Sequence, residues 1–384
     1  VEAGGQGAIM APTEVLAEQH YLSISAALAE LPVNVVLLTG SQGASERRAA
    51  LEQIAGGGAH VVVGTHALIQ KGVDFKDLSL VVVDEQHRFG VGQRTVFREK
   101  GTTPDTLVMT ATPIPRTLSL TLYGDLEVSI IDELPPGRKP VETRIVDPAE
   151  RLGAYNEVRL EMEDGRQAYV ICPLVEESEA LEDVRAAEEL REELAEEVFP
   201  ERRVGLLHGR MKAQDKREVM ASFRAGEVDV LVATVVVEVG VDVPNASAIV
   251  IEGSERFGLS QLHQLRGRVC RGLHSPKCFL VGAPKTDDSE RRLQALVEYQ
   301  DGFKLSEVDL AIRGEGTLFG SRQSGMPDLK VAKLLRDVDV LVEARREAFS
   351  LVAGDPTLKR PDHRPLRREI RELLGANVEW LFRE

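Results

Sequence analysis

The chain has 384 residues, enough for two or three domains, and its 43% hydrophobic and 28% charged content is typical of a soluble globular protein. Because it holds no run of about 18 apolar residues and no charged-then-apolar leader, we expect no transmembrane helix, no secretory signal and no membrane partner. The net charge of −15 disfavours a broadly basic surface for binding nucleic acid. A nucleic-acid partner would therefore need a local basic track such as 202–217 or 256–271.

Two series of short apolar runs, one on each side of a Pro-Pro-Gly stretch at 135–137, predict two parallel β-sheets. The runs are rich in β-branched residues and mostly lack polar alternation, as strands buried on both faces do. Amphipathic stretches at 14–31, 186–198 and 213–224 predict helices between them. The predicted strands are Ala8–Ala11, Val33–Leu38, Val61–Val63, Leu80–Val83, Leu107–Thr110, Thr143–Val146, Ala168–Cys172, Val204–Leu207, Val228–Ala233, Ala248–Ile251 and Cys278–Val281.

This alternation of strand and helix, twice over, predicts two doubly wound α/β domains. From Ser289 onward the strand pattern ends and a helical pattern remains. We therefore expect one α/β domain at 1–137, a second at 138–286 and a helical C-terminal region at 287–384. The three cysteines have no metal-ligand spacing and fit a reduced, cytoplasmic setting.

An acidic pair, Asp84 and Glu85, directly follows the predicted strand at 80–83. In parallel sheets, ligands bind at the carboxyl ends of strands. In that position Asp84 would hold Mg²⁺ through water, and Glu85 would polarise the attacking water of a nucleotide hydrolysis. A strand-to-loop turn with solvated acids explains the pair about equally well, but the Gln-His-Arg-Phe-Gly that follows favours the functional interpretation.

A second candidate half-site lies far downstream, where Gln264, Arg268 and Arg271 share one face of a predicted helix. The planar fork of arginine pairs two phosphate oxygens at once, and an arginine finger stabilises charge in phosphoryl transfer. The alternative is a solvated basic helix face. We favour this alternative less, because the arginines are interleaved with Gly and Gln in an acidic protein. Two half-sites in one chain indicate an ATP-driven two-domain motor.

Polar residues follow several other predicted strands. Thr13 would cap a helix whose free N–H groups suit a nucleic-acid phosphate, although capping alone is the favoured interpretation. Thr65 stands at a similar strand end with the same ambiguity, and a plain turn is the alternative for Arg210 and Thr234, which also follow predicted strands. Asp242, after a glycine, would bind ribose or order the cleft between the domains, or belong to a turn.

The C-terminal region contains a glycine-interrupted stretch at 309–325. Its glycines break any helix and leave a loop that carries Arg322 and Gln323. A surface hairpin explains this stretch equally well, so residue chemistry alone leaves its role open.

These residues, in this order, resemble superfamily 2 helicases and, within them, the bacterial RecG family. The resemblance extends from Ala8 to about Arg336. The alternative inside the superfamily is Mfd, which usually has a second Glu in the third place of Asp-Glu-Gln-His. The motifs that carry the resemblance are GTHALIQ at 64–70, DEQHRFGVGQR at 84–94, MTATPIPRTLSLTLYGDLEVSIIDELPPGR at 109–138, HGRM at 208–211, EVGVDVPNA at 238–246, QLHQLRGRVCRG at 261–272 and DLAIRGEGTLFGSRQSG at 309–325.

The resemblance implies two RecA-like, P-loop NTPase-type α/β domains followed by a helical region with a translocation hairpin at about 304–326. It implies ATP and Mg²⁺ as cofactors. It also implies an ATP-dependent helicase that unwinds branched double-stranded DNA, including stalled replication forks and Holliday junctions, in recombination and repair. Single-stranded DNA-binding protein is an implied protein partner, and a monomer is the implied state.

The resemblance further implies a role for each candidate residue. Asp84 would hold the metal, Glu85 would activate water, and Arg271 would be the finger. The residues that would bind ATP·Mg²⁺ or act on it are Asp84, Glu85, His87, Asp242, Gln264, Arg268 and Arg271. The residues that would contact DNA, directly or through the translocation hairpin, are Thr13, Thr65, Arg210, Thr234, Arg313, Arg322 and Gln323.

The sequence departs from the family pattern in three ways. No Gly-x-x-x-x-Gly-Lys-[Ser/Thr] loop and no N-terminal wedge domain occur in these residues, which we interpret as a truncated sequence. Cys270 stands where the family usually has Gly, and Val235 stands where it often has a second Thr. The alternatives are a non-catalytic DNA-binding remnant, disfavoured by the retained acids and arginines, and the motor subunit of a restriction system, for which no nuclease motif stands out.

We expect the 384-residue chain by itself not to hydrolyse ATP efficiently, because it has no phosphate loop to cradle the β- and γ-phosphates. Phosphate release by the purified chain, with and without DNA, checks this, and robust DNA-stimulated release would contradict it. We also expect the coding DNA upstream of Val1 to continue in frame into such a loop. A start codon near Val1 without that loop would favour the remnant.

Overall fold

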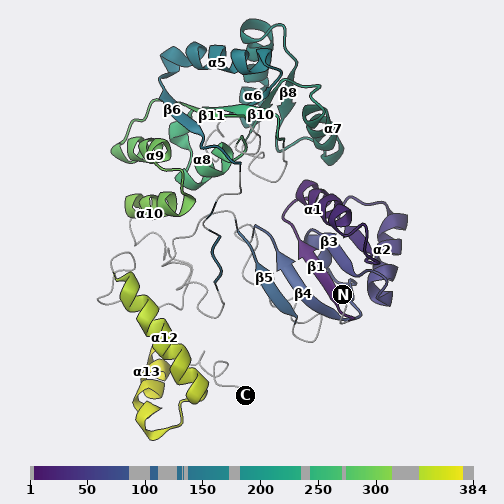
Figure 1. Cartoon of the computed structure of the whole chain (residues 1–384), viewed down its shortest axis with the longest axis vertical. Helices are drawn as coiled ribbons and strands as arrows, with labels where there is room; N and C mark the ends of the chain where they lie inside the picture. Colours follow the sequence, from purple (N-terminus) through teal and green to yellow (C-terminus); the bar gives the residue numbers. More distant parts are fainter. Residues whose placement is uncertain are drawn as a thin grey trace. The chain divides into compact units, whose positions relative to one another are not determined.

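Two parallel sheets and a separate group of helices make up the described structure, which confirms the predicted fold class (Figure 1). The expected domain limits near 137 and 286 stay a prediction. Among the helices that the structure describes, none is long and apolar enough to span a membrane. The computed structural model describes residues 4–85, 104–110, 128–131, 133, 137–172, 182–234, 243–269, 274–313 and 337–374.

The first sheet has five parallel strands in the order β2-β3-β1-β4-β5. Side chains of its central strand alternate between two faces: Ala8 and Met10 pack with α2, whereas Ile9 packs with α1. The strands are β1 (Gln6–Met10), β2 (Val35–Leu38), β3 (Val61–Gly64), β4 (Leu78–Val83) and β5 (Asp105–Val108). The helices are α1 (Glu14–Ala27), α2 (Ala44–Gly56) and the 3₁₀ turn η1 (His66–Ile69). We call residues 4–110 the first lobe.

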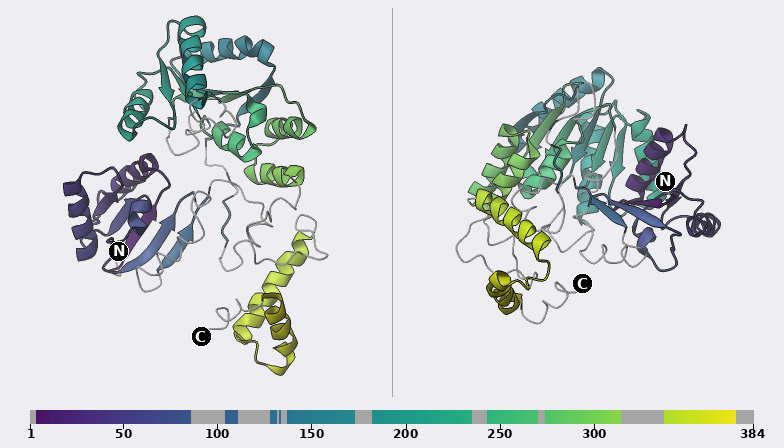
Figure 2. Two further views of the ribbon diagram at one scale, coloured as in Figure 1. Left: turned by 180° about the vertical axis from the view of Figure 1, so that it is seen from behind. Right: turned by 60° about the horizontal axis from the view of Figure 1, so that its bottom comes forward.

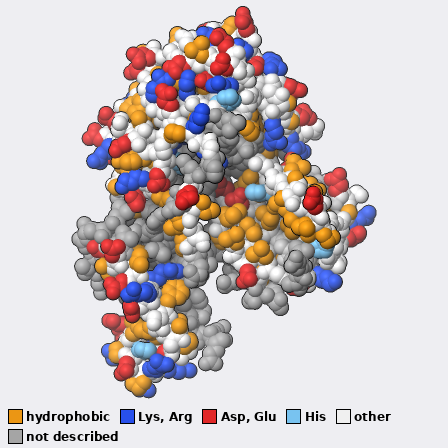
Figure 3. Space-filling model, viewed as in Figure 1, with side chains coloured by type: hydrophobic (Ala, Val, Ile, Leu, Met, Phe, Trp, Pro, Cys, Tyr) orange, Lys and Arg blue, Asp and Glu red, His pale blue; other side chains and the backbone are white. Residues whose placement is uncertain are grey.

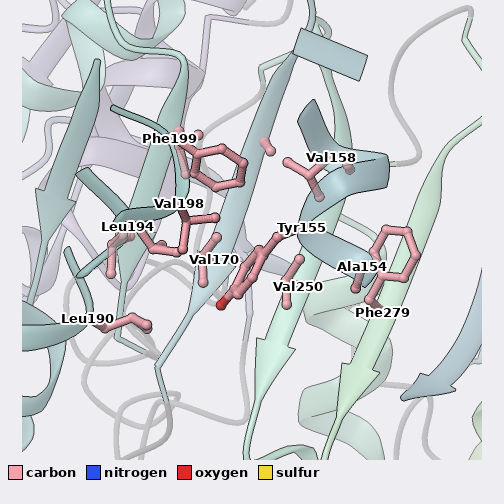
Figure 4. Packing of buried hydrophobic residues seen from close by; sticks show 14 of the residues in the cluster. Ala154, Tyr155, Val158, Val170, Leu190, Leu194, Val198, Phe199, Val250 and Phe279 are labelled. Atoms are coloured by element: carbon pink, nitrogen blue, oxygen red, sulfur yellow. The ribbon is translucent and has the colours of Figure 1, made fainter. Parts of the chain in front are cut away.

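The second sheet has six parallel strands in the order β6-β11-β10-β7-β9-β8. On one face Val170 lies in a cluster with Tyr155 and Phe199, whose rings meet edge to face at 5.7 Å between centroids (Figure 4). On the other face Tyr169 meets Phe223 at 5.0 Å. The strands are β6 (Glu142–Val146), β7 (Gln167–Ile171), β8 (Val204–Leu207), β9 (Val230–Ala233), β10 (Ala246–Glu252) and β11 (Lys277–Val281).

Helices and helical turns connect the strands of this second lobe, which we define as residues 137–300. Helix α6 passes into a π-helical turn, η4, before its chain reaches β8. The α-helices are α5 (Arg151–Glu163), α6 (Glu182–Glu193), α7 (Ala213–Arg224), α8 (Leu259–Arg266) and α9 (Asp287–Glu298). The other turns are η3 (Pro148–Glu150), η4 (Leu194–Val198) and η6 (Ser254–Arg256).

The second sheet repeats the plan of the first, with one additional edge strand. Strands β7 to β11 follow one another in space as β8-β9-β7-β10-β11, which matches β2-β3-β1-β4-β5 strand for strand. Helices lie on both sides of the central strands of each sheet, as Figure 2 shows from two further sides. Each residue at a strand end of the first lobe therefore has an equivalent in the second.

A buried glutamine opens the central strand of each sheet and performs the same task in both. The Nε2 of Gln6 donates to the carbonyl of Ile54 at 3.0 Å and to that of Ala59 at 2.7 Å. The Nε2 of Gln167 donates to the carbonyls at the two matching points, 223 and 228, at 2.5 and 2.7 Å. Each amide thus ties a helix end and a loop to the sheet, and satisfies backbone groups that burial would otherwise leave unpaired.

Two helix ends differ from the sequence prediction. Helix α1 stops at Ala27, where the N–H of Leu28 still reaches the carbonyl of Ile24, and the chain then turns before Pro32. A residue before proline is disfavoured in the helical conformation, which prevents the expected extension to Leu31. The expected helix at 186–198 is present, but its last turn widens to π-helical geometry.

Part of one face of the first sheet is exposed in the described residues, whereas its counterpart in the second sheet is buried. In the second lobe α5 packs on Ala248 and Phe279, which are 0% and 1% exposed. The equivalent positions of the first lobe include Leu80 and Leu107, which are 44% and 52% exposed, and the adjacent Met109 is 37% exposed. Hydrophobic side chains are visible together on the first lobe in Figure 3. The described part of the first lobe has no helix equivalent to α5.

A second compact unit contains the described residues from Asp301 onward. Its elements are α10 (Gly302–Arg313), α12 (Val338–Gly354), η7 (Pro361–His363) and α13 (Arg364–Leu374). Asp355 reverses the chain after α12 by accepting hydrogen bonds from the N–H of Arg360 at 2.8 Å and from Nδ1 of His363 at 2.9 Å. These bonds, the backbone one first, lower the pKa of the Asp355 carboxyl to about 2. The donors at this reversal thus favour the ionised form of Asp355.

We expect Gln6→Leu to lower the free energy of unfolding by about 3 kcal/mol, because it leaves two carbonyls and the N–H groups of Lys76 and Asp77 without their buried partner. Urea unfolding followed by circular dichroism measures the change. Gln214→Leu, at an exposed glutamine of α7, is the control and should change stability by less than about 0.5 kcal/mol. Equal effects from the two variants would contradict this account.

Candidate functional site

Asp84 and Glu85 lie at the carboxyl end of β4, as the sequence predicts. The N–H of Asp84 donates to the carbonyl of Met10 at 2.9 Å, which continues the β1–β4 ladder by one residue. Glu85 then adopts a φ of +52°, in the left-handed region that costs a non-glycine residue about 1 kcal/mol. Strained residues of this kind concentrate at functional sites, so the turn at Glu85 marks this edge as a candidate.

Two contacts hold the Asp84 carboxylate. Its Oδ1 accepts the N–H of Glu85 at 2.9 Å, and its Oδ2 lies 2.8 Å from Nε2 of His20 on α1. The Asp84 and His20 side chains are 18% and 27% exposed, so the pair lies at the surface end of the core. His20 is absent from the residues that sequence reasoning selected. The only signal in the sequence was a polar ring on the apolar stripe of a helix.

The two threonines expected to contact DNA in the first lobe take different positions. Thr13 caps α1, and its hydroxyl accepts the N–H of Leu16 at 3.3 Å, as the capping interpretation predicts. Thr65 follows β3 and is 8% exposed. Both lie at the same carboxyl edge as Asp84, because Thr13 follows β1 and β3 pairs with β1. The structure therefore brings these three residues to one edge of one sheet.

Arg210 and Thr234 lie at the corresponding edge of the second lobe. Arg210 follows β8 and is exposed to solvent. Thr234 follows β9, is 3% exposed, and its N–H donates to the carbonyl of Leu207 at 3.1 Å. By strand register, Thr234 occupies the position that Thr65 occupies in the first lobe. Sequence reasoning thus chose, without the sheet order, two residues that the fold makes equivalent.

The expectation that Gln264, Arg268 and Arg271 share a helix face needs correction within the described residues. Helix α8 ends at Arg266, with Gly267 as its cap, so Arg268 lies beyond the helix. The low helix propensity of glycine accounts for the early end. The N–H of Arg268 donates to the carbonyl of Leu265 at 2.9 Å in a tighter turn, and its side chain is buried while Gln264 is half-buried.

Arg266, between these candidates, has a structural task. Its guanidinium is buried and donates to the carbonyl of Leu296 at 2.6 Å and to that of Tyr299 at 3.0 Å. A cation at the C-terminal end of a helix satisfies free carbonyls and complements the helix dipole. Arg266 therefore joins α8 to the end of α9, and the basic run at 266–271 is not uniformly accessible to a ligand.

Several expected site residues lie outside the described residues. Arg313 is the last residue of α10, but its side chain is not described. Among the described residues, no group of three His, Cys, Asp or Glu side chains has the arrangement of a metal site. The expected residues outside the description are His87, Asp242, Arg271, Arg322 and Gln323.

Glu252 is the second-lobe equivalent of Asp84, at the end of β10. It accepts a hydrogen bond of 2.5 Å from the hydroxyl of Tyr155 on α5. Burial raises the pKa of the Glu252 carboxyl above its ordinary value, and burial together with the adjacent carboxylate raises the pKa of the Tyr155 hydroxyl. Equivalent positions of the two sheets thus each have an acidic residue whose partner lies on a helix. The environments of the two acids differ.

Three family models match the chain. The DEAD/DEAH box helicase model matches residues 1–121, and the helicase conserved C-terminal domain matches residues 151–272. The model described as ATP-dependent DNA helicase RecG, domain 3, C-terminal, matches residues 299–382. Each of the two lobes thus falls in its own helicase module, and the helical unit falls in a third.

Individual proteins match over nearly the whole chain. The ATP-dependent DNA helicase RecG of a Synechocystis strain is 50% identical over 380 residues, which are 98% of this chain and 46% of that protein. The RecG of Bacillus subtilis is 50% identical over 370 residues, 96% of this chain and 54% of that protein. A structure of RecG bound to a three-way DNA junction has a TM-score of 0.69 at 44% identity, covering 88% of this chain and 44% of that one. The chain spans about half the length of these relatives.

We expect Glu252→Gln to stabilise the protein more at pH 8 than at pH 4.5. The pKa of Glu252 is raised in the folded state, so the folded state binds more protons above pH 4.5, and wild-type stability falls as pH rises through the folded pKa. Glutamine keeps an acceptor for Tyr155 and has no charge to bury. Thermal unfolding at both pH values tests this, with Glu188→Gln, an exposed acid of α6, as control. An advantage that does not grow with pH would contradict it.

Proposed function

We propose, on the premise that this chain belongs by sequence and fold to the RecG-type DNA helicases, that the protein is an ATP-dependent helicase acting on branched double-stranded DNA. The resemblance that its motifs predicted is confirmed by relatives 50% identical over 98% and 96% of the chain. The observation that carries the proposal is the Asp84-Glu85 turn at the carboxyl edge of a parallel sheet, at the residues where the family motif begins.

Asp84 and Glu85 suit ATP hydrolysis with Mg²⁺. Carboxylate and water oxygens are the ligands that Mg²⁺ prefers, and the half-buried Asp84 carboxylate has lone pairs beyond those used by His20 and Glu85. Bound Mg²⁺ would neutralise developing charge on the phosphates. Asp84 would orient the water shell of the ion, and Glu85, turned out of the strand by its positive φ, would orient and deprotonate the attacking water.

The second lobe would supply the other half of the ATP site. Gln264 lies in the last turn of α8, and Arg268 follows in the turn that Gly267 permits. An arginine that is buried without its phosphate can contribute a charge-assisted bidentate contact once the phosphate is present. We assign Arg268 to phosphate binding and keep Arg271 as the proposed finger, with His87 and Asp242 as further ATP-site residues.

The DNA contacts are proposed at the carboxyl edges of both sheets. Thr13 and Thr65 follow β1 and β3 in the first lobe, and Arg210 and Thr234 follow β8 and β9 in the second. Of these, Thr65 and Thr234 are at matching points of the two sheets. Two copies of one scaffold can bind successive backbone phosphates with the same kind of residue, which suits sequence-independent tracking along DNA. Exposed Arg210 would supply the charge, and the threonine turns would supply backbone N–H groups.

The substrate class follows from the family. The related RecG structure is of a complex with a three-way DNA junction, and we extend that substrate to this protein. Stalled forks and Holliday junctions share such a branch, which places the proposed activity in recombination and repair. Arg313, Arg322 and Gln323 are proposed to transmit lobe movement to the duplex. Single-stranded DNA-binding protein as a partner, and a monomeric state, are proposed with them.

We expect Glu85→Gln, in the protein expressed from the complete reading frame that contains these residues, to lower ATP hydrolysis and junction unwinding at least about 100-fold, because the base that orients water is lost. Unwinding of a labelled three-way junction and of a linear duplex of equal length, with phosphate release, measures this. Binding to the junction should persist.

The control is Glu52→Gln, an exposed acid of α2, which should keep the wild-type rates. Wild-type protein that unwinds linear duplex as well as it unwinds the junction would contradict the proposed substrate. Glu85→Gln protein that hydrolyses ATP normally would contradict the proposed site.

A further inference from the structure

His20 interrupts the core-facing stripe of α1. Leu16 and Ala17 precede it on this stripe and Ile24 follows it, and all three pack against the sheet. A residue three positions after Ala17 and four before Ile24 faces the same way. The imidazole is 27% exposed at the surface end of this stripe, where it can pair with a polar side chain or with water. Its partner is Asp84, 64 residues further along the chain.

The contact holds the Asp84 carboxylate, which the proposed function requires in a fixed orientation. The Asp84 backbone is fixed because its N–H donates to Met10. Its carboxylate can still rotate about the side-chain torsions, and the N–H of Glu85 secures only Oδ1. With Nε2 of His20 2.8 Å from Oδ2, each of the two carboxylate oxygens has a hydrogen-bond partner. The remaining lone pairs then have a set direction.

The scaffold itself does not require this histidine. In the second lobe the equivalent acid, Glu252, is held by a tyrosine of α5, which precedes the central strand. In the first lobe the acid is held by α1, which follows the central strand. The two sheets have the same strand order, so this strand order is compatible with either a histidine or a tyrosine as the partner of the acid. The strand order therefore does not dictate which helix supplies the partner of this acid.

We propose that His20 is a positioning residue: its Nε2–H orients the Asp84 carboxylate toward the water shell of a nucleotide-bound Mg²⁺. This inference rests on the proposed function of the same edge. Partners that orient a metal-binding carboxylate typically contribute 10- to 100-fold to metal affinity or activity. His20 touches neither ion nor nucleotide and acts through Asp84 alone.

The test compares His20→Leu with His20→Gln in the protein from the complete reading frame. Leucine fills the apolar stripe and removes the donor, whereas glutamine keeps an N–H at a similar reach from the backbone. The first readout is equilibrium binding of a fluorescent ADP analogue as Mg²⁺ is varied. The second is the Mg²⁺ concentration that gives half-maximal ATP hydrolysis. Thermal unfolding of each variant verifies the fold.

We expect His20→Leu to raise the Mg²⁺ requirement in both readouts at least about tenfold. We expect His20→Gln to restore it to within about threefold of wild type, since an amide N–H replaces the imidazole donor. His60→Ala, at a histidine just before β3 on the opposite edge of the sheet, is the matched control and should leave the Mg²⁺ requirement unchanged.

A merely structural His20 would give a different pattern. If His20→Leu lowers the unfolding temperature but leaves the Mg²⁺ requirement at the wild-type value, the positioning role is wrong while the proposed function stands. Equal increases in His20→Leu and His60→Ala overturn it as well. If His20→Leu does not fold, an unrestored Mg²⁺ requirement in folded His20→Gln overturns it. Wild-type protein without Mg²⁺-dependent nucleotide binding would instead refute the proposed function.

Discussion

The parallel direction of the strands is the constraint on which the candidate site depends. Since all strands of a sheet run the same way, the residues that follow them gather at one edge, however far apart they lie in sequence. In the first lobe this brings Thr13, Thr65 and Asp84 together. In the second it does the same for Arg210 and Thr234. Loops at these edges can then change chemistry without disturbing the sheets.

The repeated plan places different polar residues at equivalent points of the two sheets. Asp84 and Glu252 end equivalent strands, and each has a partner on a covering helix. Burial raises the pKa of Glu252, so that carboxyl resists ionisation. Asp84 is followed by Glu85 in a left-handed turn that aims a second acid out of the sheet. The two lobes thus have different acids, with different partners, at the same point of one plan.

The sequence was sufficient for the sheets because both faces of each central strand are covered, which forces continuous β-branched runs such as 61–63 and 230–233. The sequence was also sufficient to place Asp84 at the end of a strand, because an acidic pair after such a run is a local pattern. The sequence did not identify His20 as a candidate site residue, because its partner is set by tertiary structure. Its position in the helix also has the spacing of an ordinary core-facing residue. The helix predicted from the sequence continued through Gly267, whereas α8 ends at Arg266. Side-chain periodicity alone does not indicate where a glycine ends a helix.

Within the described residues, the strand surface around Leu80, Leu107 and Met109 is exposed. An apolar strand surface open to water attracts other chains that are still folding, and chaperones bind surfaces of this kind. If the described strands were expressed by themselves, this surface would therefore favour association with other chains. A single charged side chain at the most exposed of the three, Leu107, is the smallest change that would weaken that association.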